Sequence, residues 1–227
     1  MKNLFFSISY YTVLIVAACC GVSAASAQTA PFYNDIQSFK KQDSAHLPAK
    51  HAILFVGSSS FTKWRDVQDY FPGYPIINRG FGGSALPDVI HFVNDIIITY
   101  QPKQIVIYCG ENDLAGADTT VNGKTVADRF KELFLLIRQQ LPTVPIAFVS
   151  MKPSPSRKHL WVKMIAGNSQ IKKFLSKQKK TAFIDVYYKM FNSDGTIMSD
   201  IFLEDNLHMN AKGYAIWQKA IAPFLLK

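Results

Sequence analysis

Cysteine is scarce in this chain, which has three cysteines among 227 residues. Cys19 and Cys20 fall in an apolar N-terminal stretch, so a chain that loses this stretch keeps Cys109 alone. One cysteine excludes an intramolecular disulfide and a cysteine-based metal site. Cys109 ends an apolar run, and we expect it to be a small buried hydrophobic residue.

Low-complexity tracts, heptad runs and internal repeats are also missing. The chain is instead 48% hydrophobic and 18% charged, which is the composition of an ordinary globular protein. Its length suits one domain with a core large enough to be stable.

Charge is almost absent from the N-terminus, where Lys2 is followed by an uncharged stretch that continues to Ala30. The stretch has an apolar centre at residues 13–18, and then small residues. Ala25-Ser26-Ala27 has the small-x-small form of a signal-peptidase site. We therefore predict a signal peptide at residues 1–27 and an exported protein, either periplasmic or secreted.

Two other interpretations of this stretch remain open. Val16-Ala17-Ala18-Cys19 resembles a bacterial lipoprotein box, which would lipidate Cys19 and attach the protein to a membrane. The uncharged stretch is also long enough to span a bilayer as an uncleaved anchor.

Acidic residues are fewer than basic ones, and the formal net charge is +9. Residues 1–27 contain one charged residue, Lys2, so the processed chain keeps +8. Such an excess suits nucleic acid, an anionic glycan or an anionic membrane surface. The lysines are scattered, apart from Lys172-Lys173 and the segment 177–180, and no aromatic residues alternate with them as in nucleic-acid sites. We expect a solvated basic face and no nucleic-acid site.

Apolar runs of the β type alternate with helical patterns from residue 51 onward. Strands are predicted at 53–56, 76–78, 105–108, 146–149 and 182–186, and helices at 63–70, 87–99, 125–141, 156–178 and 210–221, the last with Asn210 as N-cap. This alternation predicts a parallel sheet covered on both faces, a three-layer α/β/α sandwich. The polar residues 28–50, with a short helical pattern at 32–41, are interpreted as a lead-in to a domain at 51–227.

Glycine and polar residues follow the first three predicted strands. The segments are Gly57-Ser58-Ser59-Ser60, residues 78–84, and Gly110-Glu111-Asn112-Asp113. Because parallel strands end at one edge of the sheet, where ligands bind, these segments can converge there. Asp205 and His208 lie near the C-terminus with a spacing that places both on one side of a turn.

Acyl transfer needs a hydroxyl nucleophile, a base, a carboxylate that orients the base, and donors for the oxyanion. The sequence offers a serine as nucleophile, His208 as base and Asp205 as the orienting carboxylate. The Asn112 amide and the N–H groups of a glycine-rich loop can serve as oxyanion donors. Each has a structural alternative: a serine-rich turn, a tight glycine turn, a loop or N-cap asparagine, a hydrogen-bonded core histidine. Their occurrence together, in this order, favours a serine hydrolase.

These segments resemble the motifs of the SGNH (GDSL-type) hydrolases over residues 53–217, nearly the whole predicted domain. The family's Gly-Asp-Ser motif matches Gly57-Ser58-Ser59 and implies Ser59 as nucleophile. The second motif implies Gly83, and the Gly-x-Asn-Asp motif Asn112, as oxyanion donors beside the N–H of Ser59. The Asp-x-x-His motif implies Asp205 and His208 as the other triad members.

The resemblance also implies a flavodoxin-like sheet of five parallel strands in the order 2-1-3-4-5. It implies hydrolysis of carboxylic esters without a metal or an organic cofactor. Ser58 stands where the family keeps an aspartate, and because that side chain does not attack the ester, we expect activity with altered local hydrogen bonds. Glu204 competes with Asp205 for the orienting role, but its neighbouring position would point it away.

Two features of the sequence bear on the substrate. The sequence has no long apolar insertion that would form a lid or an acyl tunnel. Three aromatic residues, Trp64, Phe81 and Tyr108, lie near the motifs in the sequence. They can form part of the core, line the wall of a pocket or provide a surface for sugar rings. We expect short acyl groups, such as acetyl on a polysaccharide. Lysophospholipid or platelet-activating-factor-like esters, and a non-catalytic glycan-binding member of the fold, are the alternatives.

Overall fold

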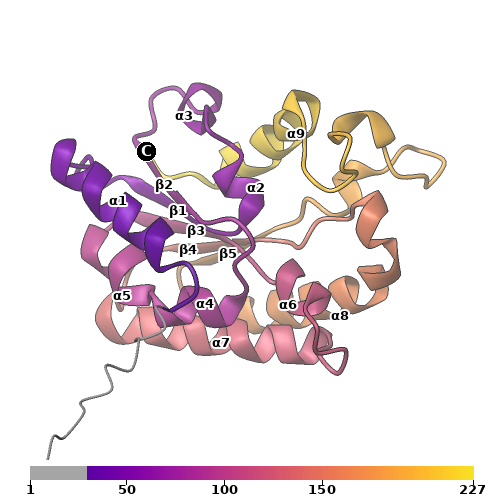
Figure 1. Ribbon diagram of the computed structural model, residues 1–227, viewed down its shortest axis with the longest axis horizontal. Coiled ribbons are helices and arrows are strands. Elements are labelled where there is room, and N and C mark those ends of the chain that lie inside the picture. Colours follow the sequence, from indigo (N-terminus) through magenta and orange to yellow (C-terminus); the bar gives the residue numbers. More distant parts are fainter. Residues whose placement is uncertain (1–29) are drawn as a thin grey trace, which may run out of the picture. The chain divides into compact units, whose positions relative to one another are not determined.

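A parallel sheet of five strands lies at the centre of the computed structural model, which describes residues 30–227 (Figure 1). Its spatial order is β2-β1-β3-β4-β5, and every neighbouring pair is parallel. The strands are β1 (Ile53–Gly57), β2 (Ile76–Gly80), β3 (Gln104–Tyr108), β4 (Ile146–Val149) and β5 (Thr181–Ile184). The predicted strand order and parallel arrangement are confirmed.

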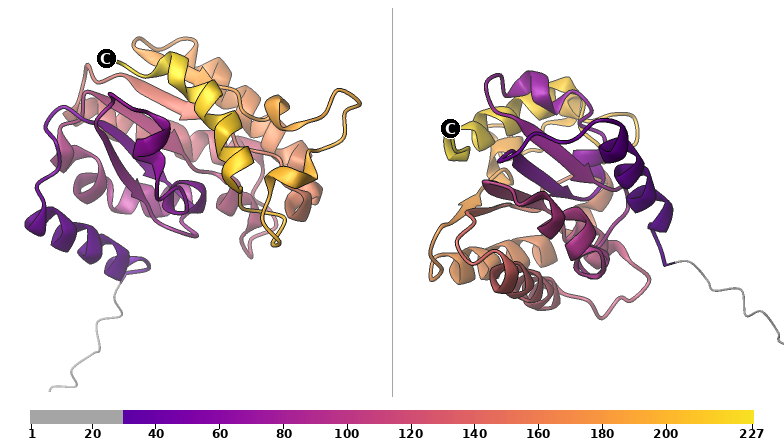
Figure 2. Two further views of the ribbon diagram at one scale, coloured as in Figure 1. Left: turned by 90° about the horizontal axis from the view of Figure 1, so that it is seen from above. Right: turned by 90° about the vertical axis from the view of Figure 1, so that its left-hand side faces the viewer.

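Helices cover both faces of this sheet (Figures 1 and 2). One face carries α2 (Ser59–Thr62), α3 (Val67–Tyr70) and α9 (Ala211–Ile221). The other carries α4 (Leu86–His91), α5 (Val93–Ile96), α6 (Glu111–Ala115), α7 (Gly123–Gln140) and α8 (Trp161–Leu175). Short 3-10 turns are η1 (Ile98–Tyr100), η2 (Pro155–Leu160), η3 (Tyr188–Met190), η4 (Ser199–Ile201) and η5 (Ala222–Phe224). The three-layer α/β/α prediction is therefore confirmed.

The central strands are buried on both faces, which explains their unbroken apolar runs. On the face of α9, Phe55 and Tyr108 pack with Trp64 and Trp217. The aromatic residues that the sequence places near the motifs, Trp64, Phe81 and Tyr108, are at most 2% exposed. They belong to the core and offer no surface to a sugar ring.

Several helices differ from their predicted bounds. Of the helix predicted at 63–70, only the part that forms α3 is helical, and α2 ends before the predicted range begins. The helix predicted at 87–99 is divided into α4, α5 and η1. The helix predicted at 156–178 begins with η2, in which Arg157 has non-helical angles (φ −111°, ψ 23°). Asn210 does cap α9, because its side chain accepts the N–H groups of Lys212 and Gly213.

The helix α1 (Tyr33–Ala45), within the segment interpreted as a lead-in, lies along the edge strand β2 (Figure 2). It belongs to the same compact unit as the sheet, Pro31–Lys227. Arg79 of β2 donates hydrogen bonds to Asp43 of α1 and to the hydroxyl of Tyr100 (2.6 Å), and its guanidinium lies 5.0 Å from the ring of Phe39. These contacts hold α1 against the sheet.

The predicted signal peptide at 1–27 and the alternative lipidation site at Cys19 lie outside the described residues. Within residues 30–227, the helices are too short or too polar to cross a bilayer.

Candidate active site

Ser59 owes its position to the sharp turn at the end of β1. Gly57 has φ +141°, and a Cβ at this residue would lie 1.9 Å from the carbonyl oxygen of Tyr108, so the turn requires glycine. Ser59 then occupies the first position of α2 and is partly exposed. Its N–H, like others in a first helical turn, has no acceptor within the described part of the chain.

His208 and Asp205 form a hydrogen-bonded chain with Ser59. Nε2 of His208 lies 2.9 Å from Oγ of Ser59, and Nδ1 lies 2.6 Å from Oδ2 of Asp205. Because a carboxylate only accepts, the ring carries its proton on Nδ1, and Nε2 accepts the hydroxyl proton of Ser59. The arrangement is that of a nucleophile, a base and an orienting carboxylate.

Backbone groups fix the carboxylate of Asp205. Its Oδ1 accepts the N–H groups of Leu207 and His208, both at 2.9 Å. Burial alone would raise the pKa of Asp205, but the hydrogen bonds from the His208 ring and these N–H groups outweigh it and lower the pKa to about 2. The carboxylate is therefore ionised at neutral pH. The side chain of the exposed Glu204 forms no hydrogen bond to His208 among the described residues.

Asn112 and the glycine-rich loop reach the same edge. The side-chain N–H₂ of Asn112, on α6, donates to Oγ of Ser58 (2.7 Å) and to the carbonyl of Ser84 (2.9 Å). A Cβ at Gly82 would lie 3.9 Å from Cβ of Ser59, so this loop adjoins the nucleophile. Gly83 is exposed with φ +88°, and its N–H has no acceptor within residues 30–227. The structure thus brings Ser59, His208, Asp205, Asn112 and the glycine loop together.

Two residues of η2 also reach this site, and the sequence analysis missed both. Arg157 donates from Nη2 to Oδ1 of Asn112 (2.7 Å) and from Nη1 to Oε2 of Glu111 (3.1 Å). Ser156 donates its N–H (3.1 Å) and its hydroxyl (3.0 Å) to the carbonyl of Asn206, which lies between Asp205 and His208. Their sequence signal is weak: they follow the fourth strand, whose end is at the same edge.

Behind Asn112 lies a buried group of charged residues. Glu111 accepts from the Nζ of Lys152 (3.2 Å), from the N–H of Lys152 (3.0 Å) and from the hydroxyl of Tyr108. Burial opposes the charge of Glu111, but Lys152 and Arg157 outweigh it and lower its pKa. Burial raises the pKa of Tyr108 well above its usual value, so this hydroxyl stays protonated and donates.

The described residues contain no cluster of three or more His, Cys, Asp or Glu side chains placed to hold a metal. Cys109 is buried, and burial raises the pKa of its thiol well above the usual value. A protonated thiol in such a place is a poor nucleophile.

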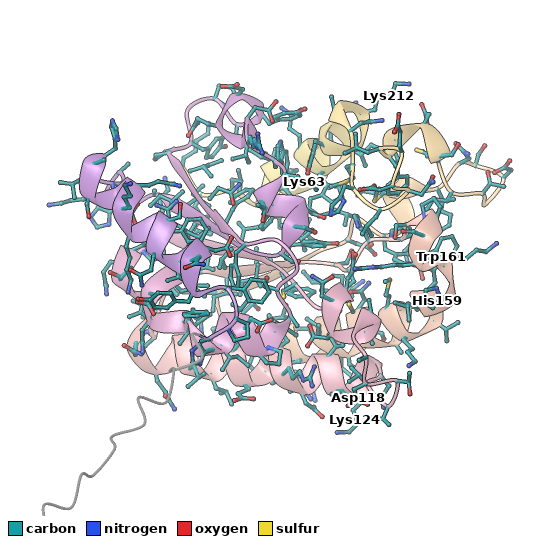
Figure 3. All side chains as sticks on the ribbon, in the orientation of Figure 1. Lys63, Asp118, Lys124, His159, Trp161 and Lys212 are labelled. Atoms are coloured by element: carbon teal, nitrogen blue, oxygen red, sulfur yellow. The ribbon has the colours of Figure 1, made fainter. Side chains whose placement is uncertain are left out.

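Basic side chains are spread over the surface of the domain. Lys63 at the end of α2, Lys124 in the first turn of α7 and Lys212 in the first turn of α9 extend from three separate elements (Figure 3). Lys124 and Lys212 pair with the neighbouring carboxylates of Asp128 and Asp200. The positive charge is therefore dispersed and partly neutralised locally.

Comparison with known proteins assigns most of the chain to one sequence family. The sequence model of the GDSL-like lipase/acylhydrolase family matches residues 46–216. No curated protein sequence matches the chain.

Solved structures with the same fold share little sequence with the chain. A GDSL-like lipase from Bacteroides thetaiotaomicron has a TM-score of 0.70 at 19% identity, covering 83% of this chain and 95% of its own. A catalytic mutant of an acetylxylan esterase from Geobacillus stearothermophilus has a TM-score of 0.62 at 14% identity, covering 80% and 97%. A protein from Streptococcus pneumonia, provisionally named a platelet activating factor, has a TM-score of 0.72 at 19% identity, covering 85% and 92%.

Proposed function

The chain belongs to the GDSL-like lipase/acylhydrolase family, and on that premise we propose that it is an exported serine esterase that removes short acyl groups, above all acetyl, from carbohydrates. One observation carries the proposal: the chain of hydrogen bonds that joins Ser59, His208 and Asp205. The family assigns a hydrolase acting on esters, and the residue roles and the substrate are our own inference.

The reaction has two steps. His208 takes the hydroxyl proton of Ser59 as Oγ attacks the ester carbonyl, and Asp205 stabilises the imidazolium that forms. The oxyanion accepts from the N–H groups of Ser59 and Gly83 and from the amide of Asn112. His208 then protonates the leaving alcohol. In the second step His208 activates a water molecule, which releases the acid and regenerates Ser59.

The exposure of the site supports a carbohydrate ester. The side chain of Asp205 is 45% exposed, and Gly82 and Gly83 are exposed beside the nucleophile. An acyl group on a bulky polymer can reach so open a site. A long acyl chain would need an enclosed apolar pocket to gain binding energy from its methylene groups.

A lipid ester is the second candidate substrate. Leu203, which is 44% exposed, precedes Asp205 on the same loop, and its N–H bonds the carbonyl of His208 (2.7 Å). An exposed leucine beside the triad favours contact with an apolar chain. Lipidation at Cys19 would place the enzyme beside such substrates.

A panel of esters tests the proposal on purified protein lacking residues 1–27. We expect release of acetate from acetylated xylo-oligosaccharides and rates that fall as the acyl chain of p-nitrophenyl esters lengthens, with Ser59→Ala as the inactive control. Faster hydrolysis of lysophosphatidylcholine or of long acyl esters would favour the lipid candidate. Failure to hydrolyse any ester would contradict the proposed function.

A further inference from the structure

We propose that Arg157 is a positioning residue of this site, which acts on the oxyanion through Asn112 by orienting the amide and by placing positive charge behind it. The inference rests on the proposed function. The backbone of Arg157 lies in η2, and its long side chain brings the guanidinium to two consecutive residues of α6. Its side chain is 16% exposed, so this contact is largely sheltered from water.

The guanidinium fixes one end of the Asn112 amide. Arginine has donors and no acceptor, so the group that meets Nη2 at 2.7 Å is the amide oxygen. The opposite end, Nδ2, then faces Ser58 Oγ and the carbonyl of Ser84. Ser58 directly precedes Ser59, so this orientation places the N–H₂ end of the amide at the turn that carries the nucleophile. The same guanidinium is held by Glu111, so a rotation of the amide would leave Nη2 of Arg157 facing a donor in place of its acceptor.

The orientation alone does not free an N–H for the oxyanion. In the structure, both hydrogens of Nδ2 have acceptors, Ser58 Oγ and the Ser84 carbonyl. An oxyanion is a stronger acceptor than a neutral hydroxyl, so it can take the hydrogen that Ser58 holds. A cation bound to Oδ1 polarises the amide and strengthens its N–H as a donor. Arg157 therefore favours this exchange.

The buried charged residues behind Asn112 carry a net positive charge on the side of the amide that faces away from the nucleophile. Glu111 supplies one negative charge, whereas Lys152 and Arg157 supply two positive charges. The side chains of Lys152 and Glu111 are 1% and 7% exposed, so water screens these charges weakly. This excess of positive charge, acting through the amide, stabilises the negative charge that develops on the oxyanion. An uncharged ester carbonyl gains little from it. Arg157 should therefore affect kcat more than KM.

The experiment measures kcat and KM for p-nitrophenyl acetate in four proteins: wild type, Arg157→Ala, Asn112→Ala and the double variant. We expect Arg157→Ala to lower kcat by about 10-fold to 100-fold, below the full loss of one oxyanion donor, with KM within about twofold of wild type. Because Arg157 acts through Asn112, we expect the double variant to match Asn112→Ala within about twofold. Methylguanidinium should restore part of the kcat of Arg157→Ala, and none in the double variant.

Arg129→Ala is the matched control. Arg129 pairs with Asp113, the residue after Asn112, at 2.8 Å, so its loss perturbs the same short helix without touching the amide. We expect it to lower the melting temperature and to show no coupling with Asn112→Ala. If Arg157→Ala does not fold, Arg157→Lys replaces it, because lysine keeps the charge but lacks the two-pronged guanidinium. We expect the kcat of Arg157→Lys to lie below that of wild type. In the Asn112→Ala background, the same substitution should leave kcat unchanged.

Independent, multiplicative losses in the double variant would overturn the role of Arg157. In that case, wild-type hydrolysis and covalent reaction of Ser59 with a fluorophosphonate would leave the proposed esterase function intact. A wild-type protein that neither hydrolyses esters nor reacts with the fluorophosphonate would overturn the esterase function itself.

Discussion

Three adjacent hydroxyl groups follow β1, and the structure gives each a different neighbour. Ser59 Oγ meets His208, whereas Ser58 Oγ accepts from Asn112. Ser60 is buried, and its side chain contacts the hydroxyl of Tyr108. The sequence alone could not distinguish the three, because their partners lie up to 149 residues away. Only the resemblance to a family with a known motif separated Ser59 from its neighbours.

Replacing the base should cost more activity than replacing the carboxylate that orients it. Without Asp205, His208 still has its Nε2 near Ser59, whereas without His208 the hydroxyl of Ser59 loses its hydrogen-bonded base. We expect Asp205→Ala to keep at least about tenfold more kcat than His208→Ala. Steady-state kinetics on p-nitrophenyl acetate measure both. Equal losses, or a larger loss in Asp205→Ala, would contradict these roles.

The amide of Asn112 should act on the transition state and little on substrate binding. We expect Asn112→Ala to lower kcat by about 10²-fold to 10³-fold, the usual effect of losing one oxyanion donor, with KM nearly unchanged. The readout is again kcat and KM, supported by a circular-dichroism spectrum that shows intact folding. A rise in KM at constant kcat would assign Asn112 to ground-state binding.

Among the elements, α1 is joined to the edge strand β2 by an ion pair between Asp43 and Arg79. The pair between Asp43 and Arg79 has side chains 22% and 10% exposed, and Asp43 also accepts from the hydroxyl of Tyr100 (2.5 Å). Loss of the carboxylate leaves a largely buried guanidinium without its charged partner. We expect Asp43→Ala to lower the free energy of unfolding by about 1.5–3 kcal/mol, as for other hydrogen bonds to charged groups.

Urea unfolding measures this change, and Lys40→Ala is its matched control on the same helix. Lys40 pairs with Asp95 with side chains 52% and 34% exposed, so its loss should change stability by less than about 1 kcal/mol. Equal effects of the two variants would show that α1 is not held by the Arg79 contact.

The strands could be predicted because their apolar runs are local signals, whereas the helices near the site could not. The turn η2 replaces the start of a predicted helix, and its residues Ser156 and Arg157 bond to Asn206 and Asn112. These partners are 50 and 45 residues away. Helical periodicity carries no information on such contacts. The same holds for α1, whose contact with β2 joins Asp43 to Arg79 across 36 residues.

At the scale of the whole molecule, stability should fall in acid. Six carboxyl groups have folded pKa values below their usual ones: Asp205, Glu111 and the surface residues Asp118, Asp128, Asp194 and Asp200. Burial has the opposite effect on Asp113 and raises its pKa. Where the folded pKa is lower, the unfolded chain binds more protons. The contribution of these groups is therefore complete above the unfolded pKa of about 4 and is lost as the pH falls toward 2.

Urea unfolding at pH 7, 5 and 3 measures this dependence. We expect a small change between pH 7 and pH 5 and a clear loss of stability by pH 3. Asp205→Asn should show a shallower loss than wild type, because one of the groups with a lowered pKa is gone. Stability that stays constant or rises down to pH 3 would contradict the assigned directions.

The most direct measurement for the whole account is covalent labelling by a fluorophosphonate, followed by peptide mapping and by p-nitrophenyl acetate hydrolysis. Wild type and Ser60→Ala, whose side chain contacts Tyr108, are predicted to be labelled on Ser59 and to hydrolyse the ester. Ser59→Ala is predicted to do neither. Label on another residue, or full activity in Ser59→Ala, would contradict Ser59 as the nucleophile and with it the esterase mechanism.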